Sequence, residues 1–306
     1  MDPITQFIYA TSGGSKAPFD CHFLVIAGGG AAGQSNNWMS GGGGAGGYIT
    51  SWDNGGNEMS GGGATASSPL LLKVNTTYFI TIGAGAANGT HTNGSESAFE
   101  GYDSAGAYFL ISATGGGRGG AQNTGYQGGS GGGGGAIHNM GYSGGNGVSG
   151  QGYGGGTGYS QNTNSWYCYN YGGSYCTPTN GGTGGGGGAG GAGGASWNGG
   201  VGGVGQLSTI SGSSVYRASG GKGYSYTNGH PPGYANINGY QSDGSGAGSA
   251  GSDAKNGRIY LRYPSKYTLT NPGGGLTFQS GWTGGYTSTT ENCTEIVAGT
   301  GNIEFI

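Results

Sequence analysis

Runs of glycine constrain the fold of this chain more than any other feature of its sequence. Glycine supplies 84 of the 306 residues, and segments such as 128–135, 144–158 and 181–205 carry few side chains. Glycine loses more backbone freedom on folding than alanine, about 0.5–1 kcal/mol per residue, or on the order of 40–80 kcal/mol over this chain. Because the runs have little apolar surface to bury, order in them has to come from paired backbone N–H and C=O groups.

Two common glycine-rich states do not fit this composition. Collagen needs glycine at every third position and abundant proline, whereas the runs 131–135 and 184–188 are continuous glycine and the chain has 8 prolines. Disorder is typical of chains with few aromatic residues and high charge, whereas 11% of these residues are aromatic and 7% are charged. We therefore expect ordered polyproline-II-type helices, with about three residues per turn, that lie side by side and exchange hydrogen bonds.

Glycine-poor segments between the runs have the composition and alternation of β strands. These segments are 4–12, 19–27, 70–74, 78–82, 107–113, 258–263, 294–297 and 302–305. The pairs within 70–82 and within 294–305 are close enough in sequence to predict two hairpins, with Tyr78, Ile80 and Ile82 on one face of the first. No window combines a helical period with caps, so the sequence predicts almost no α-helix.

These features predict a mainly β fold with irregular, polyproline-II-type glycine helices: a glycine-rich helix bundle (sandwich) bordered by short β strands. Three domains are expected: an N-terminal β arm or attachment segment (1–18), the bundle (19–264) and a C-terminal β segment (265–306). Run 181–205 would be about 78 Å long as one straight helix at about 3.1 Å per residue, so we expect it to fold back near 196–198. Bulky side chains then lie on loops at the ends of the bundle, where binding residues are commonly found.

A dinucleotide-binding turn is suggested locally by Gly28, Gly30 and Gly33, which have G-x-G-x-x-G spacing after an apolar segment. Such a site needs a helix after the third glycine and an acidic residue at the end of a second strand. Residues 34–47 do not have a helical pattern, and Asp53 lies in a polar, glycine-flanked stretch. We therefore expect these glycines to bring backbone close to backbone, and we predict no cofactor.

Catalytic and metal sites are also not indicated by the sequence. The 4 histidines are dispersed, and the 12 acidic residues form no pattern of paired carboxylates or of metal ligands. The net charge of −3 offers no basic surface for nucleic acid, and no apolar stretch approaches the length of a membrane span. We expect a protein that is not an enzyme, with no catalytic residue, no metal, no nucleic-acid partner and no membrane insertion.

The segment WYCYNYGGSYC at 166–176 is the best candidate for a binding loop. Tyrosine and tryptophan offer large contact areas with a polar tip, suited to sugar rings or protein surfaces. The candidate receptor-contact residues are Trp166, Tyr167, Tyr169, Tyr171 and Tyr175. Cys168 and Cys176 form a candidate disulfide that would pre-organise the loop. Two alternatives stay open: the tyrosines cap the end of the bundle, and the cysteines are free thiols in a reducing cytoplasm.

An ordered series of segments resembles the glycine-rich domains of bacteriophage tail-fibre, adhesin and other appendage proteins. The series is FLVIAGGGAAG (23–33), SGGGGAGGYITS (40–51), YFITIGAGAANGT (78–90), NGSESAF (93–99), the middle glycine runs and GRIYLRYP (257–264). The resemblance implies a virion surface component built on packed polyglycine-type helices, with a receptor-binding tip in some members. TEIVAGTGNIEF (294–305) looks like the β hairpin that often borders such domains, whereas 166–176 and 267–282 have no counterpart.

Two functions follow as expectations. The first is a viral appendage protein of the tail-fibre type that contacts a host cell through aromatic loops at the end of the bundle. It would be made in the host cytoplasm and act at the virion surface, and its partners would be other virion or fibre subunits and a host surface glycan or outer-membrane protein. The alternative is a purely structural subunit of a virion fibre, capsid decoration or extracellular filament. In both cases we expect a homo-oligomer or a part of a larger assembly.

Overall fold

A computed structural model defines most of the chain. The described residues are 17–33, 40–87, 89–137, 140–160, 166–170, 174–178, 180–195, 200–227, 243–248, 252–279 and 290–306. Within them the fold is mainly β with almost no helix, as predicted, and the helical element is a 3-10 turn at Gly61–Gly63. The predicted strand 4–12 and the predicted turn at 196–198 lie outside the described residues.

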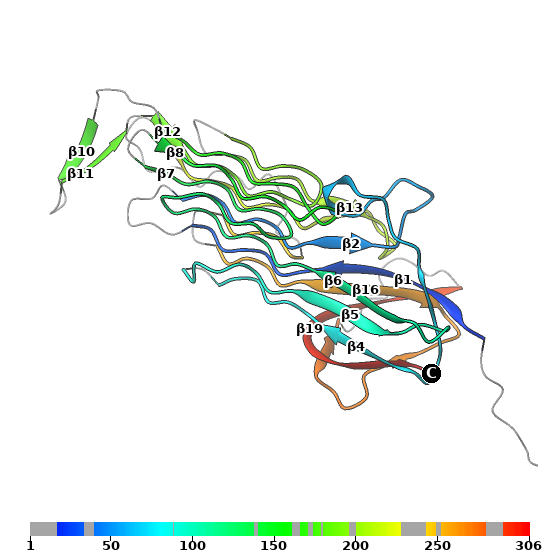
Figure 1. Ribbon diagram of the computed structural model, residues 1–306. Coiled ribbons are helices and arrows are strands. Elements are labelled where there is room, and N and C mark those ends of the chain that lie inside the picture. The colour runs from blue at the N-terminus through cyan, green and yellow to red at the C-terminus, as the bar shows by residue number, and fades with distance from the viewer. Residues whose placement is uncertain are drawn as a thin grey trace, which may run out of the picture.

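Antiparallel strands build the half of the molecule that contains the C-terminus (Figure 1). Seven strands follow in the order β2-β1-β16-β19-β4-β5-β6, while β3 pairs with β1, and β17 and β18 pair with β19. Their bounds are Phe19–Ile26 (β1), Tyr48–Thr50 (β2), Leu70–Leu72 (β3), Thr77–Thr81 (β4), Ser97–Tyr102 (β5), Tyr108–Ala113 (β6), Arg258–Pro264 (β16), Leu269–Thr270 (β17), Leu276–Phe278 (β18) and Glu291–Phe305 (β19).

The predicted hairpin at 294–305 is wrong, because this segment is one continuous strand. The first part of β19 pairs with β16 and its last part pairs with β4. Gly299 lies between the two parts with φ of 100°, a conformation that only glycine adopts readily, so the strand bends without ending. The bend folds the sheet over itself, and the two halves face each other across a core.

The predicted hairpin at 70–82 is also wrong, although both of its strands exist. β3 pairs with β1, whereas β4 pairs with β19 and β5. Between them Asn75 has a φ of 53°, and its amide donates to the carbonyl of Phe305 instead of closing a turn within the segment. The predicted inward face is present, since Tyr78 and Ile80 are buried in the core and Ile82 packs against it.

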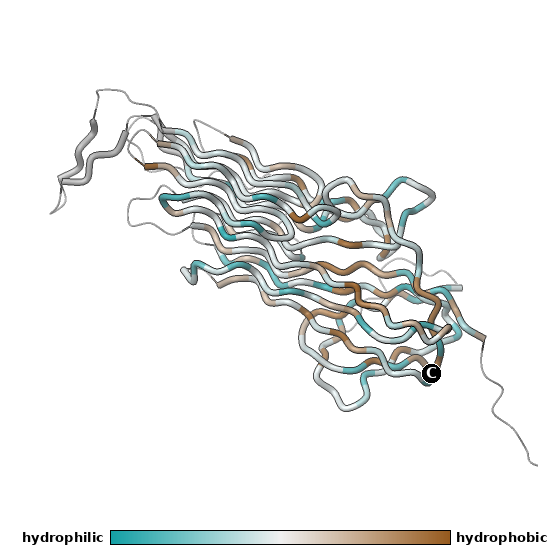
Figure 2. The backbone as a smooth tube through the Cα atoms, in the orientation of Figure 1, coloured by the Kyte–Doolittle hydropathy of each residue, from teal (hydrophilic) through white to brown (hydrophobic). Residues whose placement is uncertain are grey.

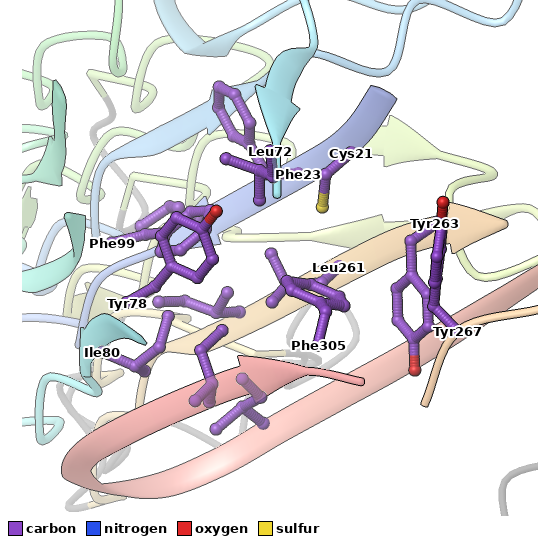
Figure 3. Packing of buried hydrophobic residues seen from close by; sticks show 14 of the residues in the cluster. Cys21, Phe23, Leu72, Tyr78, Ile80, Phe99, Leu261, Tyr263, Tyr267 and Phe305 are labelled. Carbon is purple, nitrogen blue, oxygen red and sulfur yellow. The ribbon is translucent and has the colours of Figure 1, made fainter. Parts of the chain in front are cut away.

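The core between the two halves of the sheet is made of aromatic and branched side chains (Figure 3). Its larger members are Phe19, Phe23, Val25, Leu72, Tyr78, Ile80, Phe99, Ile259, Leu261, Tyr263, Tyr267, Ile296, Ile303 and Phe305. Hydropathy along the chain follows this arrangement: apolar residues concentrate in the sheet half, and the glycine segments are nearly neutral (Figure 2). The hydrophobic effect therefore stabilises mainly the sheet half of the molecule.

The opposite face of β1 and β16 is buried as well. Leu24 and Ile26 of β1 and Tyr260 of β16 pack with Tyr48 and with a group that includes Ile210, Ala189 and Ala218. Ile210 lies in the hairpin of β13 (Gln206–Ser208) and β14 (Val215–Arg217). β1 and β16 thus form a middle layer, which explains why the second half of β1 is apolar on both faces, while the second face of β16 carries Tyr260 between two arginines.

The glycine runs extend from the sheet half as long segments that lie side by side (Figure 1). Their amides donate to carbonyls of segments far away in sequence, and donors three residues apart reach the same neighbour. In segment 41–47, the amides of Gly41, Gly44 and Gly47 donate to Gly120, Gly117 and Thr114 of one neighbouring segment. Those of Gly42 and Ala45 donate to Gly184 and Gly187 of a second, and those of Gly43 and Gly46 donate to Ala247 and Gly244 of a third. This differs from a β ladder, where alternate residues point to the same neighbouring strand.

Run 181–205 folds back, as its length required. The amide of Gly188 donates to Gly191, and that of Gly185 donates to Gly194, so the chain reverses at 189–191. The amide of Gly194 then donates to Val201, which brings segment 200–205 against its predecessor. The turn at 189–191 was not predicted.

The predicted domain limits at residues 18 and 264 stay a prediction. The strand β19, which lies in the proposed C-terminal segment, pairs with β16 and β4 of the proposed bundle domain. Across the described ranges, no helix is long and apolar enough to cross a lipid bilayer.

Candidate functional site

The ends of the glycine segments that point away from the sheet half gather at one end of the molecule, here called the distal end (Figure 1). Short strands occur there: β7 (Ala136–Ile137), β8 (Met140–Gly141), β9 (Tyr159–Ser160) and β12 (Asn180–Gly182). β9 pairs with β12, and the predicted binding loop lies in the sequence between them. The C-terminus lies at the opposite end, in the sheet half.

The predicted binding loop contains a hairpin of β10 (Trp166–Asn170) and β11 (Ser174–Pro178). Its register pairs Tyr169 with Tyr175 and Cys168 with Cys176. The hairpin lies beyond the ends of the glycine segments (Figure 1). Four of the five candidate contact residues therefore belong to one two-stranded unit, and the fifth, Tyr171, lies outside the described residues.

The register bears on the candidate disulfide. Directly opposed residues of an antiparallel pair have Cα atoms about 4.5–5.5 Å apart. Disulfides join cysteines whose Cα atoms are about 4.4–6.8 Å apart. Because Cys168 is directly opposite Cys176, the backbone permits a bond between them, and the disulfide stays a prediction.

Other bulky side chains are exposed around the distal end, and sequence reasoning missed them. At this end Met140 is 55% exposed and Tyr159 is 38% exposed, whereas Tyr126, whose amide donates to the carbonyl of Arg118 partway along a glycine segment, is 41% exposed. The guanidinium of Arg118 lies 3.7 Å from the centre of the Tyr126 ring, a cation–π contact. The signal in the sequence was the position of these residues at the borders of glycine runs, where a segment ends and a loop begins.

The glycines of the dinucleotide-like motif serve backbone contacts. The amides of Gly28, Gly30 and Gly33 donate to the carbonyls of Ser95, Gly44 and Gly41 at 2.9–3.0 Å. A Cβ atom on Gly30 would lie 2.4 Å from the carbonyl oxygen of Gly117. Amides that would cradle a phosphate in a dinucleotide site are thus committed to neighbouring segments.

A cluster of charged side chains lies in the sheet half, on the face of β16 that carries Tyr260. Nε of Arg258 is 2.9 Å from Asp243 Oδ1, and its Nη1 is 3.3 Å from Glu295 Oε1. Nε of Arg217 is 3.6 Å from Asp243 Oδ2. Burial raises the pKa of Glu295 despite its pairing with Arg258. The cluster joins β14 and residue 243 to β16 and β19.

Cys21 and Cys293 are free thiols in the sheet half. Burial raises the pKa of Cys21 strongly and that of Cys293 to about 12. A thiol of this kind stays protonated near neutral pH and reacts slowly. Among the residues that the structure describes, no group of three or more His, Cys, Asp or Glu side chains is placed to hold a metal ion.

Comparison with known proteins gives no relative. No protein-family model matches the sequence, and neither a curated protein nor a solved structure matches it.

Proposed function

We propose that this chain is a non-enzymatic viral appendage protein, of the kind found in phage tail fibres, that contacts a host cell surface through its distal end. The observation that carries the proposal is the separation of two kinds of structure. Apolar side chains form the core of the sheet half, whereas the far ends of the glycine segments carry short strands, the hairpin β10–β11 and the exposed side chains of Met140 and Tyr159. The family resemblance of the sequence points to the same function.

The rigidity of such a tip would come from the glycine segments, which we propose are polyglycine-II-type helices packed as a bundle. The three-residue repeat of their hydrogen-bond partners supports this proposal, because a polyproline-II-type helix has three residues per turn. A segment inside such a bundle has neighbours in three directions, as segment 41–47 does. A bundle of this kind would hold its loops in fixed positions, which reduces the entropy lost on binding.

Binding would rest on aromatic stacking and on polar contacts from the hairpin β10–β11. The chain has 22 tyrosines and a charged fraction of 7%, which favours a neutral partner surface such as a glycan over a strongly charged one. Tyrosine can stack on a sugar ring and hydrogen-bond through its hydroxyl. A host outer-membrane protein is the second class of receptor that such a surface fits.

Removing the hairpin tests the proposed receptor contact. Because Tyr159 and Ser160 of β9 already pair with Gly182 and Gly181 of β12, deletion of Trp166–Cys176 leaves a short loop between two paired strands. We expect variant particles to assemble and to adsorb to host cells at least about tenfold more slowly, because the residues that make the receptor contact are gone. Replacement of Val201, 53% exposed on a glycine segment, by alanine is the control. Unchanged adsorption of the deletion variant would contradict the proposed contact.

A thiol count tests the candidate disulfide. If Cys168 and Cys176 are bonded, the protein unfolded in denaturant without reductant exposes two reactive thiols, those of Cys21 and Cys293, and four after reduction. Before unfolding, we expect little reaction of Cys21 and Cys293 at pH 8, since burial raises the pKa of both thiols. Four thiols without reductant would show that the pair is open. By chain-entropy arguments the bond would stabilise the hairpin by about 2–3 kcal/mol.

The alternative function is a purely structural subunit of a fibre, decoration or filament. Exposed apolar side chains on the sheet half favour it, among them Tyr102, Tyr108 and Leu110. Strand exchange through the C-terminal segment, which the sequence suggested, is disfavoured because β19 already pairs with β16 and β18 over its first part and with β4 and β17 over its last part. The N-terminal segment 1–16 lies outside the described residues.

A further inference from the structure

The strand β6 lies at one end of the strand order and has β5 as its strand partner. The amide of Asp103 donates to the carbonyl of Ala107 at 2.9 Å, and the register continues with Tyr102 opposite Tyr108. In an antiparallel pair, hydrogen-bonded and non-hydrogen-bonded residues alternate. The odd-numbered residues of β6 therefore bond to β5, and the N–H and C=O groups of Tyr108, Leu110 and Ser112 point to the open edge.

Gln151 covers one half of this edge. Its side-chain Oε1 accepts from the amide of Thr114 at 2.7 Å, and its Nε2 donates to the carbonyl of Ser112 at 3.2 Å. Its own carbonyl accepts from the amide of Tyr48 in β2 at 3.0 Å. One glutamine thus takes the place of a strand between β6 and β2. Within the described ranges, no comparable group reaches the outward backbone groups of Tyr108 and Leu110.

The open half of the edge has none of the usual protection against pairing. Natural edge strands carry lysine, proline or a bulge that blocks a second strand, whereas β6 reads YFLISA and pairs with β5 without a register shift. Tyr108 is 55% exposed and Leu110 is 51% exposed. Tyr102 on β5, 59% exposed, packs beside Tyr108 and extends this apolar surface, whereas Glu100, which accepts a hydrogen bond from the Tyr108 hydroxyl, separates Leu110 from Phe79 of β4. Exposed apolar side chains beside unpaired backbone groups are typical of an interface.

We infer that two copies of this chain associate through β6, by antiparallel pairing about a two-fold axis at Phe109. This register places Tyr108 opposite Leu110 of the partner subunit and Leu110 opposite Tyr108 of the partner subunit. Both free residues then exchange backbone hydrogen bonds, and the two sheets join into one. An isologous interface has to be self-complementary, and here each exposed tyrosine packs on an exposed leucine.

The length of the free edge selects a second copy over a longer strand from another protein. A strand added along the whole of β6 would need the carbonyl of Ser112 and the amide of Thr114, which Gln151 already binds. In a pairing centred on Phe109, the residues of the second copy that lie opposite Ser112 and Thr114 belong to its turn, 104–106. The second strand therefore ends before it would need the backbone groups that Gln151 binds. Tyr108 and Leu110 are themselves uncharged, and the carboxylate beside them, Glu100 of β5, already accepts a hydrogen bond from the Tyr108 hydroxyl. β6 lies in the sheet half, away from β10 and β11 (Figure 1), so a dimer leaves both distal ends accessible.

The inference is tested by measuring the mass of the full-length protein by sedimentation over a micromolar concentration series. We expect a dimer, and we expect Leu110→Lys to weaken it at least tenfold, because a charge at the edge blocks pairing. Leu110 lies opposite Glu100 of β5, so the variant keeps a favourable neighbour and should fold. Val201→Lys, at a residue of similar exposure on a glycine segment, is the matched control and should leave the dimer intact.

The double variant Tyr108→Glu/Leu110→Lys tests the register. In the inferred pairing each new glutamate lies opposite a new lysine of the second copy, so the dimer should re-form at low salt and weaken at high salt. A monomeric wild-type protein, or a dimer unaffected by Leu110→Lys, overturns the inference. If both Leu110→Lys and the double variant are monomeric, the two-fold axis at Phe109 is wrong. These results do not depend on host attachment, so they stand or fall separately from the proposed function.

Discussion

Replacing Gly43 by alanine is expected to abolish the folded state. A Cβ atom at this position would lie 2.0 Å from the carbonyl oxygen of Gly30 and 2.8 Å from that of Ala31. Both contacts are with backbone, so no side chain can move aside. The two segments would have to separate, which breaks the hydrogen bond from the amide of Gly30 to Gly44.

The effect would spread beyond that pair, because Gly43 also joins two other segments. Its amide donates to Ala247 and its carbonyl accepts from Gly221, each at 2.8 Å. We expect a loss of more than about 4 kcal/mol, a large share of the 5–15 kcal/mol that stabilises a typical domain. Insoluble protein, or loss of the cooperative unfolding transition in urea followed by fluorescence, is the expected result.

Two other glycines provide matched controls for Gly43→Ala. A Cβ atom on Gly248 would have its nearest neighbour at 3.7 Å, and one on Gly154 would have it at 3.2 Å. Gly248→Ala should be neutral or slightly stabilising, because alanine reduces the freedom of the unfolded chain. Gly154→Ala should be intermediate. If Gly43→Ala folds with a stability within about 0.5 kcal/mol of the parent, the range of ordinary surface substitutions, the close backbone packing is wrong.

Replacing Phe305 by alanine is expected to cost about 3–5 kcal/mol of unfolding free energy, the usual range for a buried phenylalanine. The ring is fully buried, with its centre 5.0 Å from those of Phe19 and Tyr263 and 6.1 Å from that of Tyr78. These rings come from β1, β16 and β4, so the truncation leaves a cavity where both halves of the sheet meet. Urea unfolding monitored by circular dichroism measures the loss.

The neighbouring residue gives the control for Phe305→Ala. Ile306 is 48% exposed, and Ile306→Ala should change the stability by no more than about 0.5 kcal/mol. Equal effects of the two substitutions would show that the end of β19 does not close the core.

Local patterns in the sequence predicted the strands better than their partners. The segments 19–27, 107–113 and 258–263 correspond to β1, β6 and β16 to within one residue at each end. The two predicted hairpins failed because nearness in sequence favoured pairing, whereas burial decided it. Tyr78 and Phe305 reach the common core only if β4 pairs with β19, so the chain forgoes the local turn.

The candidate site was predicted unevenly for a similar reason. The aromatic loop at 166–176 was predicted because its aromatic residues are close together in sequence, whereas its hairpin register, which pairs Tyr169 with Tyr175, was not. Tyr126 and Met140 were missed because each is an isolated bulky residue. The cover that Gln151 provides for the edge of β6 has no signal in the sequence at all.

The sequence by itself determined where this chain forms strands, where it has no side chains, and that its glycine runs have to be held by backbone hydrogen bonds. It could not determine which run lies beside which, because glycine segments are nearly identical and carry no side chain to select a neighbour. The tertiary structure decides this through the strands at the segment ends. The order of β2, β1, β16, β19, β4, β5 and β6, fixed by burial of their apolar side chains, sets where each segment leaves the sheet and therefore which carbonyls its amides meet.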